Sequence, residues 1–231
     1  MTERRNEWFL LRRGPLTFRR FVNMMFLPYT LMNVCYVLVG SLLARPVYFD
    51  RMGGMALVYF LAVGVGAHAL DASAPNRPWG SFLSRPQFLA IAVAALGVSL
   101  SIGVYYALAF ALVLFPIGLL ELFFLLSYNL ELFRGRFHTD LWFAFSWGFL
   151  PVLAGFAVQT GAVTFLAVAG GLFGFLTAYV EISAARPYKA LIREGGGASS
   201  ELAMKFEAIL KGIVLCVASA ALLLLVLYYF G

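Results

Sequence analysis

Long apolar runs separated by short polar gaps make up most of this sequence. Each run is long enough to form an α-helix that crosses a bilayer, which takes about 20 residues. The apolar residues are continuous rather than alternating, which indicates helices rather than strands. We therefore predict an all-α, polytopic transmembrane bundle of about seven helices. The predicted helices cover residues 21–44, 54–73, 87–105, 107–129, 139–159, 161–184 and 203–230.

Two of the predicted helix boundaries depend on few residues. The division between the third and fourth helices rests on Gly103 and the pair Tyr105 and Tyr106. The division between the fifth and sixth is the tight pair Thr160 and Gly161. Glycine is a frequent sign of a break in a helix, so we place both boundaries there.

The composition indicates that lipid is the solvent of this chain. Of its 231 residues, 62% are hydrophobic and 12% are charged. An ordinary soluble domain is about half apolar and about a quarter charged. The mean hydropathy of +0.89 agrees with this contrast. A soluble core of this length could not bury so much apolar surface.

The placement of the basic residues predicts the orientation in the membrane. All of the 17 Lys and Arg residues except Arg45 and Arg51 fall in segments on one side of the predicted bundle. Cytoplasmic loops carry such an excess, so we expect a cytoplasmic N-terminus in an inner or plasma membrane. Residues 1–20 would be a basic cytoplasmic segment and residues 21–231 a single transmembrane domain. Because the cations cluster between apolar runs, we expect no nucleic-acid partner.

The first candidate site follows the second predicted helix. His68 and Asp71 are three residues apart and therefore share a helical face, and Asn76 and Arg77 come shortly after them. Ionisable groups at membrane depth are costly and are usually functional. The alternative is that the helix ends here at the level of the lipid headgroups, where such groups cost little.

The second candidate site follows the sixth predicted helix and resembles the first. Glu181 and Asp71 are each followed by any residue, then Ser and Ala, and later by Arg-Pro and an aromatic residue. Arg186 and Lys189 belong to this second segment. The similarity suggests an internal repeat, a common feature of membrane folds. Arg-Pro also marks other helix boundaries in this chain, which is the alternative explanation.

A third polar cluster lies between the fourth and fifth predicted helices. It includes Tyr128, Arg134, His138 and Asp140. We interpret most of it as a cytoplasmic loop of mixed charge. Glu121 is different because it lies within an apolar run, where a carboxyl group needs a partner. Two interpretations of Glu121 stay open, a contact between helices and a part of a cavity wall.

The arrangement of these segments resembles the UbiA superfamily of intramembrane prenyltransferases. Residues 40–44, at the end of the first predicted helix, are similar to the first helix of that family. The Asp71 segment falls where the family has its first Asp-rich motif, and the Glu181 segment falls where it has the second. The run 128–155 also resembles the family. The resemblance covers roughly residues 18–195.

The chain also departs from the pattern of that family. The first family motif is an Asn-Asp pair followed by further aspartates, whereas here Leu70 precedes a single Asp71. The second motif has two aspartates, whereas Glu181 stands alone. The family has nine helices and this chain predicts seven. Two alternatives to an enzyme therefore stay open: a non-catalytic UbiA-like membrane protein that binds lipid or a partner protein, and a small transporter.

The resemblance implies a Mg²⁺-dependent prenyltransferase that moves an isoprenoid group from a prenyl diphosphate to a membrane-associated acceptor. It implies that Asp71 and Glu181 hold Mg²⁺ and form the catalytic set together with His68. One or two protein carboxylates suffice for Mg²⁺ when substrate phosphates and waters complete its coordination. The residues that would bind the diphosphate are Asn76, Arg77, Tyr128, Arg134, Arg186 and Lys189.

Overall fold

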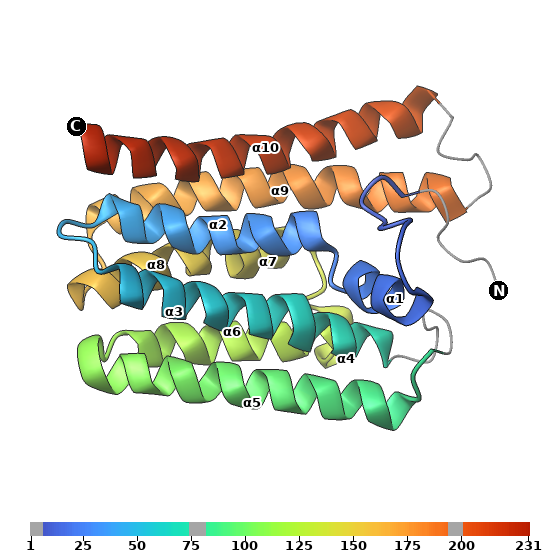
Figure 1. Ribbon diagram of the computed structural model, residues 1–231, viewed down its shortest axis with the longest axis horizontal. Helices are drawn as coiled ribbons and strands as arrows, with labels where there is room; N and C mark the ends of the chain where they lie inside the picture. Colours follow the sequence, from blue (N-terminus) through green and yellow to red (C-terminus); the bar gives the residue numbers. More distant parts are fainter. Residues whose placement is uncertain (1–6, 74–81, 194–200) are drawn as a thin grey trace.

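The computed structural model describes residues 7–73, 82–193 and 201–231, and all regular structure in these ranges is helical. The α-helices are α1 (Leu16–Met24), α2 (Leu27–Leu43), α3 (Phe49–Tyr59), α4 (His68–Ala72), α5 (Arg85–Phe110), α6 (Leu114–Asn129), α7 (Asp140–Ala144), α8 (Leu150–Thr160), α9 (Phe165–Arg193) and α10 (Glu201–Phe230). The long helices lie side by side along one axis, with α10 at one edge and α5 at the other (Figure 1).

Short segments of wider or tighter helix join some of these elements. A π-helical segment, Phe60–Ala67, connects α3 to α4, so that Phe49–Ala72 is one continuous helix. A second π-helical segment, Phe145–Phe149, connects α7 to α8, and a 3₁₀ turn, Phe133–Gly135, precedes α7. Such π-helical segments are frequent at functional sites because they change the direction of nearby side chains.

Five of the helices are long and apolar enough to cross a membrane, and a sixth span results if α1 and α2, which meet at an angle of 46°, are counted together. The prediction of an all-α bundle with several helices that could span a membrane is thereby confirmed. The sequence predicted about seven spans, and the difference is α6. Its 16 residues extend only about 24 Å at 1.5 Å per residue, which is less than the hydrocarbon thickness of about 30 Å.

Two helices are longer than the sequence predicted. The predicted boundary near Gly103 is wrong, because α5 continues to Phe110 and the chain turns after it. One glycine costs a helix only about 1 kcal/mol, which packing in a bundle easily offsets. The helix α9 continues through Pro187 to Arg193. Segment 185–193 is therefore helical instead of a loop.

The helix α8 forms the centre of the bundle, and all of its residues except the last are buried. It packs closely on α2 through glycines. A Cβ atom at Gly40 would lie 2.0 Å from the carbonyl oxygen of Val152, and one at Gly155 would lie 2.2 Å from the carbonyl oxygen of Val37. The hydroxyl of Ser41 donates a hydrogen bond of 2.9 Å to the carbonyl oxygen of Gly155. Small residues that let backbones meet are typical of helix contacts in membranes.

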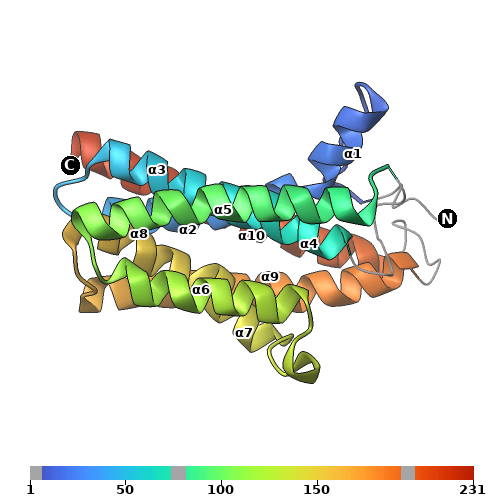
Figure 2. The ribbon, with the colours of Figure 1, turned by 90° about the horizontal axis from the view of Figure 1, so that it is seen from below.

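The two ends of the bundle differ in character. The α2–α3, α5–α6 and α8–α9 connections lie at one end, together with the C-terminus (Figure 1). The helices α1 and α4 and the C-terminal part of α9 lie at the other, which we call the cavity end (Figures 1 and 2). Arg45 and Arg51 belong to the first end, whereas Arg186 and Lys189 belong to the cavity end. This separation agrees with the charge asymmetry of the sequence, and the side of the membrane stays a prediction.

Candidate functional site

A cavity of about 850 Å³, the central cavity, lies at the cavity end and is lined by residues of α2, α4, α6, α9 and the α6–α7 connection. One wall extends from Phe26, the residue before α2, to Tyr36 of α2, which corresponds to about 15 Å along the helix. Charged side chains line it near the helix ends, and Val63 and Trp147 contribute an apolar surface. A cavity with both kinds of surface suits a ligand that has a polar head and an apolar tail.

The central cavity brings together most of the site residues that the sequence predicted. They are His68, Asp71, Tyr128, Glu181, Arg186 and Lys189. Arg134 is not among the lining residues, because it lies on the exposed 3₁₀ turn before α7, with a φ of 59°. Asn76 and Arg77 lie outside the described residues. The two acidic segments, which are four predicted helices apart in the sequence, therefore face one cavity.

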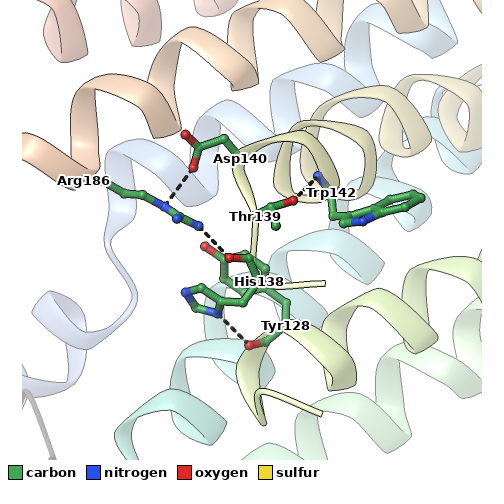
Figure 3. A network of polar contacts seen from close by, with 6 residues as sticks. All are labelled: Tyr128, His138, Thr139, Asp140, Trp142 and Arg186. Carbon is green, nitrogen blue, oxygen red and sulfur yellow. Dashed lines mark hydrogen bonds and ion pairs between the residues drawn. The ribbon is translucent and has the colours of Figure 1, made fainter. Parts of the chain in front are cut away.

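Arg186 joins α9 to the α6–α7 connection and to the first residue of α7 (Figure 3). Its Nε atom lies 2.8 Å from Oδ1 of Asp140, and its Nη2 atom donates a hydrogen bond of 3.1 Å to the carbonyl oxygen of His138. The ring of His138 stacks on Tyr128 with 4.1 Å between centroids, and its Nδ1 atom lies 3.1 Å from the carbonyl oxygen of Tyr128. These contacts fix the loop against the wall of the cavity. The sequence pattern indicated only a loop of mixed charge at His138 and Asp140, and it did not predict this role.

Lys189 places a positive charge between the two acidic segments. Its ammonium group lies 5.3 Å from the centre of the Phe26 ring, and its charge acts on both Glu181 and His68. The His68 ring stacks on Phe26 with 4.9 Å between centroids, and the charge of Asp71 also acts on His68. These side chains therefore form one mixed group of charges around an aromatic ring.

Three tyrosines lie near Glu181, a residue that is only 6% exposed. Tyr29, Tyr36 and Tyr128 line the same cavity and lie within electrostatic range of Glu181. The hydroxyl groups of Tyr36 and Thr177 share a hydrogen bond of 2.8 Å. Aromatic faces attract cations, so this wall suits a ligand on which positive charge develops.

The acidic residues supply a small set of metal ligands. Within the described ranges, no group of three or more His, Cys, Asp or Glu side chains could hold a metal ion. Asp71 and Glu181 line the same cavity and could each give carboxylate oxygens. Mg²⁺ prefers six oxygen ligands. The residues present therefore fit only a Mg²⁺ ion that takes most of its coordination from phosphate oxygens and water.

Asn33 is a cavity residue that the sequence pattern did not predict. Its Nδ2 atom donates a hydrogen bond of 2.8 Å to the carbonyl oxygen of Trp147, which belongs to the π-helical segment before α8. Among the described residues, its buried Oδ1 atom has no hydrogen-bond partner. A buried amide oxygen without a partner is costly unless a ligand or water satisfies it. The sequence feature that could have identified Asn33 is its polar amide side chain within the first apolar run.

Comparison of this chain with protein-family models, curated proteins and solved structures finds no match. The resemblance to the UbiA superfamily therefore rests on the arrangement of the residues themselves.

Proposed function

We propose that this protein is a UbiA-like intramembrane prenyltransferase that binds an isoprenoid diphosphate in the central cavity. The observation that carries the proposal is the convergence of both acidic segments, with cationic side chains, on one cavity that also has an apolar wall. Asp71 and Glu181 come from distant parts of the sequence, and a role in one ligand site explains why both line the same cavity. The acceptor would be a second, membrane-associated molecule.

The cations of the cavity would bind the diphosphate. Lys189 and Arg186 line the cavity near the end of α9 and can pair with phosphate oxygens. Arg186 is also bound to Asp140, which holds its guanidinium group in a fixed direction. A Mg²⁺ ion held by Asp71 and Glu181 would neutralise further phosphate charge when bound. The isoprenoid tail would lie along the apolar wall near Val63 and Trp147.

The proposed reaction is the substitution of diphosphate by the acceptor. The bond between the allylic carbon and the diphosphate oxygen breaks, and the bonding electrons leave with the diphosphate. The acceptor supplies the electron pair of the new bond to that carbon and then releases a proton to water. Ring faces of Tyr29, Tyr36 and Tyr128 would stabilise positive charge on the allylic group. Electrostatic stabilisation of this kind is often the largest contribution to a rate.

A second candidate function is a membrane protein that binds the same isoprenoid diphosphate without transferring it. The observation in its favour is the small number of carboxylates, because no group of three metal-binding side chains occurs among the described residues. Weak metal binding would leave the leaving group poorly stabilised. The two functions predict the same ligand and differ in whether a product forms.

Binding of tritiated farnesyl and geranylgeranyl diphosphate to the purified protein in detergent tests the shared part of both functions. For both functions we expect retention that is weakened at least tenfold by Lys189→Ala. For the prenyltransferase we also expect that retention requires Mg²⁺ and is abolished by Asp71→Asn. The matched control is Lys205→Ala, since Lys205 is exposed on α10 and pairs with Glu201 at 2.7 Å. That variant should bind as the unchanged protein does.

Transfer is tested by incubating the same protein with the tritiated diphosphates and a membrane lipid extract. Tritium in a new lipid product that depends on Mg²⁺ and on Asp71 supports the prenyltransferase. Retention that is unaffected by Mg²⁺ and by Asp71→Asn, without product, supports the binding protein instead. Failure of the unchanged protein to retain either diphosphate contradicts both functions.

A further inference from the structure

A second cavity of about 260 Å³, the lateral chamber, lies on the other side of the helix Phe49–Ala72. Its lining comes mostly from α3, α5 and α6. Leu100 and Leu119 line it and are 57% and 70% exposed, so the chamber faces the lipid. Val63 lines both the chamber and the central cavity and separates them.

The lateral chamber contains one carboxyl group in an otherwise mostly apolar surface. Glu121 lies near the middle of α6, and its Oε1 atom accepts a hydrogen bond of 2.9 Å from the hydroxyl of Tyr59. Among the described residues, its Oε2 atom has no hydrogen-bond partner. The hydroxyl of Ser99, also in the lining, is already used because it donates to the carbonyl oxygen of Val58. Both interpretations of Glu121 from the sequence therefore apply, since it joins two helices and lines a cavity.

Two glycines show that the chamber has room beside the backbone. Gly103 of α5 and Gly118 of α6 line it, and a Cβ atom added to either would meet nothing within 4 Å. Larger side chains at these positions would fill the chamber without a backbone clash. The space is thus a property of these residue types and can be removed by substitution.

We propose that the lateral chamber binds a neutral, membrane-dissolved alcohol or phenol whose hydroxyl group donates a hydrogen bond to Glu121. The apolar walls would contact the hydrocarbon part of the molecule, and the unused carboxyl oxygen would accept its only polar hydrogen. Small-molecule sites are commonly apolar cavities with a few polar groups that fix orientation. The proposal does not depend on the ligand of the central cavity.

The chamber selects a hydroxyl group over the other occupants that membranes supply. A lipid acyl chain could fill the space but would leave the oxygen of Glu121 without a partner, which costs free energy in an apolar surrounding. An ammonium ion would have to lose its water against walls that offer it little besides this carboxyl group. A hydroxyl group carries one donor and loses less hydration, so it satisfies Glu121 at the lower cost.

Photocrosslinking with tritiated 4-hydroxybenzophenone tests the proposal, with tritiated benzophenone as the matched probe that lacks the hydroxyl group. The purified protein in detergent is irradiated with each probe, and labelled peptides are located by mass spectrometry. We expect the phenol to label residues of α5 or α6 that line the chamber at least fivefold more than benzophenone does. An excess of unlabelled phenol should compete with this labelling.

Substitutions distinguish binding of the probes in the chamber from their general absorption into detergent. Gly103→Leu should reduce labelling by the phenol at least fivefold because it fills the chamber. Gly97→Leu is the control, since Gly97 is on the same helix, has equal space beside it and does not line the chamber. Glu121→Leu should remove the preference for the phenol, whereas Glu121→Gln, which keeps an acceptor oxygen, should retain part of it. Equal labelling by the two probes, or full labelling of Gly103→Leu, would overturn the proposal.

Discussion

Arg186 makes two contacts at once that a lysine at the same position could not make together. Its guanidinium group contacts Asp140 through one nitrogen and the carbonyl oxygen of His138 through another (Figure 3). A planar fork of donors makes this possible, and an ammonium group on a flexible chain does not reproduce it. His138 belongs to the α6–α7 connection and Asp140 is the first residue of α7. The two contacts therefore hold the end of that loop at the wall of the central cavity.

We therefore expect Arg186→Lys to loosen the α6–α7 connection. Both side chains of the Arg186–Asp140 pair are partly exposed, so the loss is about 1 kcal/mol, the upper range for such ion pairs. Hydrogen–deuterium exchange of residues 133–139 should become roughly fivefold faster. The control is Arg136→Lys, an exposed arginine of the same loop. An equal increase in that variant would contradict a specific role of Arg186.

Sequence patterns identified single residues well and their partners poorly. Asp71 and Glu181 were found because ionisable groups at the ends of apolar runs are unusual, and they line one cavity. The partner of Asp140 on α9 could not be predicted, because 46 sequence positions separate it from Arg186 and only the fold brings them together. The contact between Asn33 and the carbonyl group of Trp147 depends on the fold in the same way.

The crossing of α9 and the segment before α8 is, like the contact between α2 and α8, sensitive to substitution of its glycines. A Cβ atom at Gly148 would lie 2.2 Å from the carbonyl oxygen of Gly174, and one at Gly174 would lie 2.3 Å from that of Gly148. In both cases the added Cβ atom meets a backbone carbonyl group, so no change of side-chain rotamer can relieve the clash. The two helices would have to separate, and α9 carries the cavity residues Glu181 and Lys189.

We expect Gly148→Ala to destabilise the protein by about 1–3 kcal/mol, as overpacking usually does. Its thermal unfolding in detergent should begin at a lower temperature, and its retention of prenyl diphosphate should fall in parallel. The control is Gly212→Ala on α10, where an added Cβ atom meets nothing within 4 Å. That variant should be as stable as the unchanged protein or slightly more stable, because alanine favours helices. An unchanged melting temperature for Gly148→Ala would show that the helices are not packed this closely.

Helices were predictable where the hydrophobicity of the sequence determines them. Helix ends that depend on packing against neighbouring helices were less predictable. The apolar runs located the long helices, because a segment in lipid must satisfy its backbone internally. The end of α5 was misplaced, since Gly103 does not break a helix that neighbours support. The helical course of α9 beyond Pro187 was also missed, because other helices of a bundle can compensate for the lost hydrogen bond.

At the scale of the whole molecule, the topology explains why the charges converge. Successive long helices run in alternate directions, so the ends of α4 and α9 meet at the cavity end (Figures 1 and 2). The acidic segments and most of the cations of the described chain gather there, whereas Arg45 and Arg51 lie at the opposite end. The positive-inside rule then predicts that the central cavity opens to the cytoplasm.

Cysteine labelling tests this orientation in a chain whose Cys35 and Cys216 are first replaced by alanine. Arg136→Cys places a thiol in the α6–α7 connection, and Val163→Cys places one between α8 and α9. With a membrane-impermeant maleimide, we expect the first thiol to react only in inside-out membrane vesicles and the second only in right-side-out vesicles. The reverse result would place the cavity on the outer face, where a cytoplasmic prenyl diphosphate could not reach it. Reaction of both thiols from the same side would mean that the helices between them do not cross the bilayer as this bundle requires.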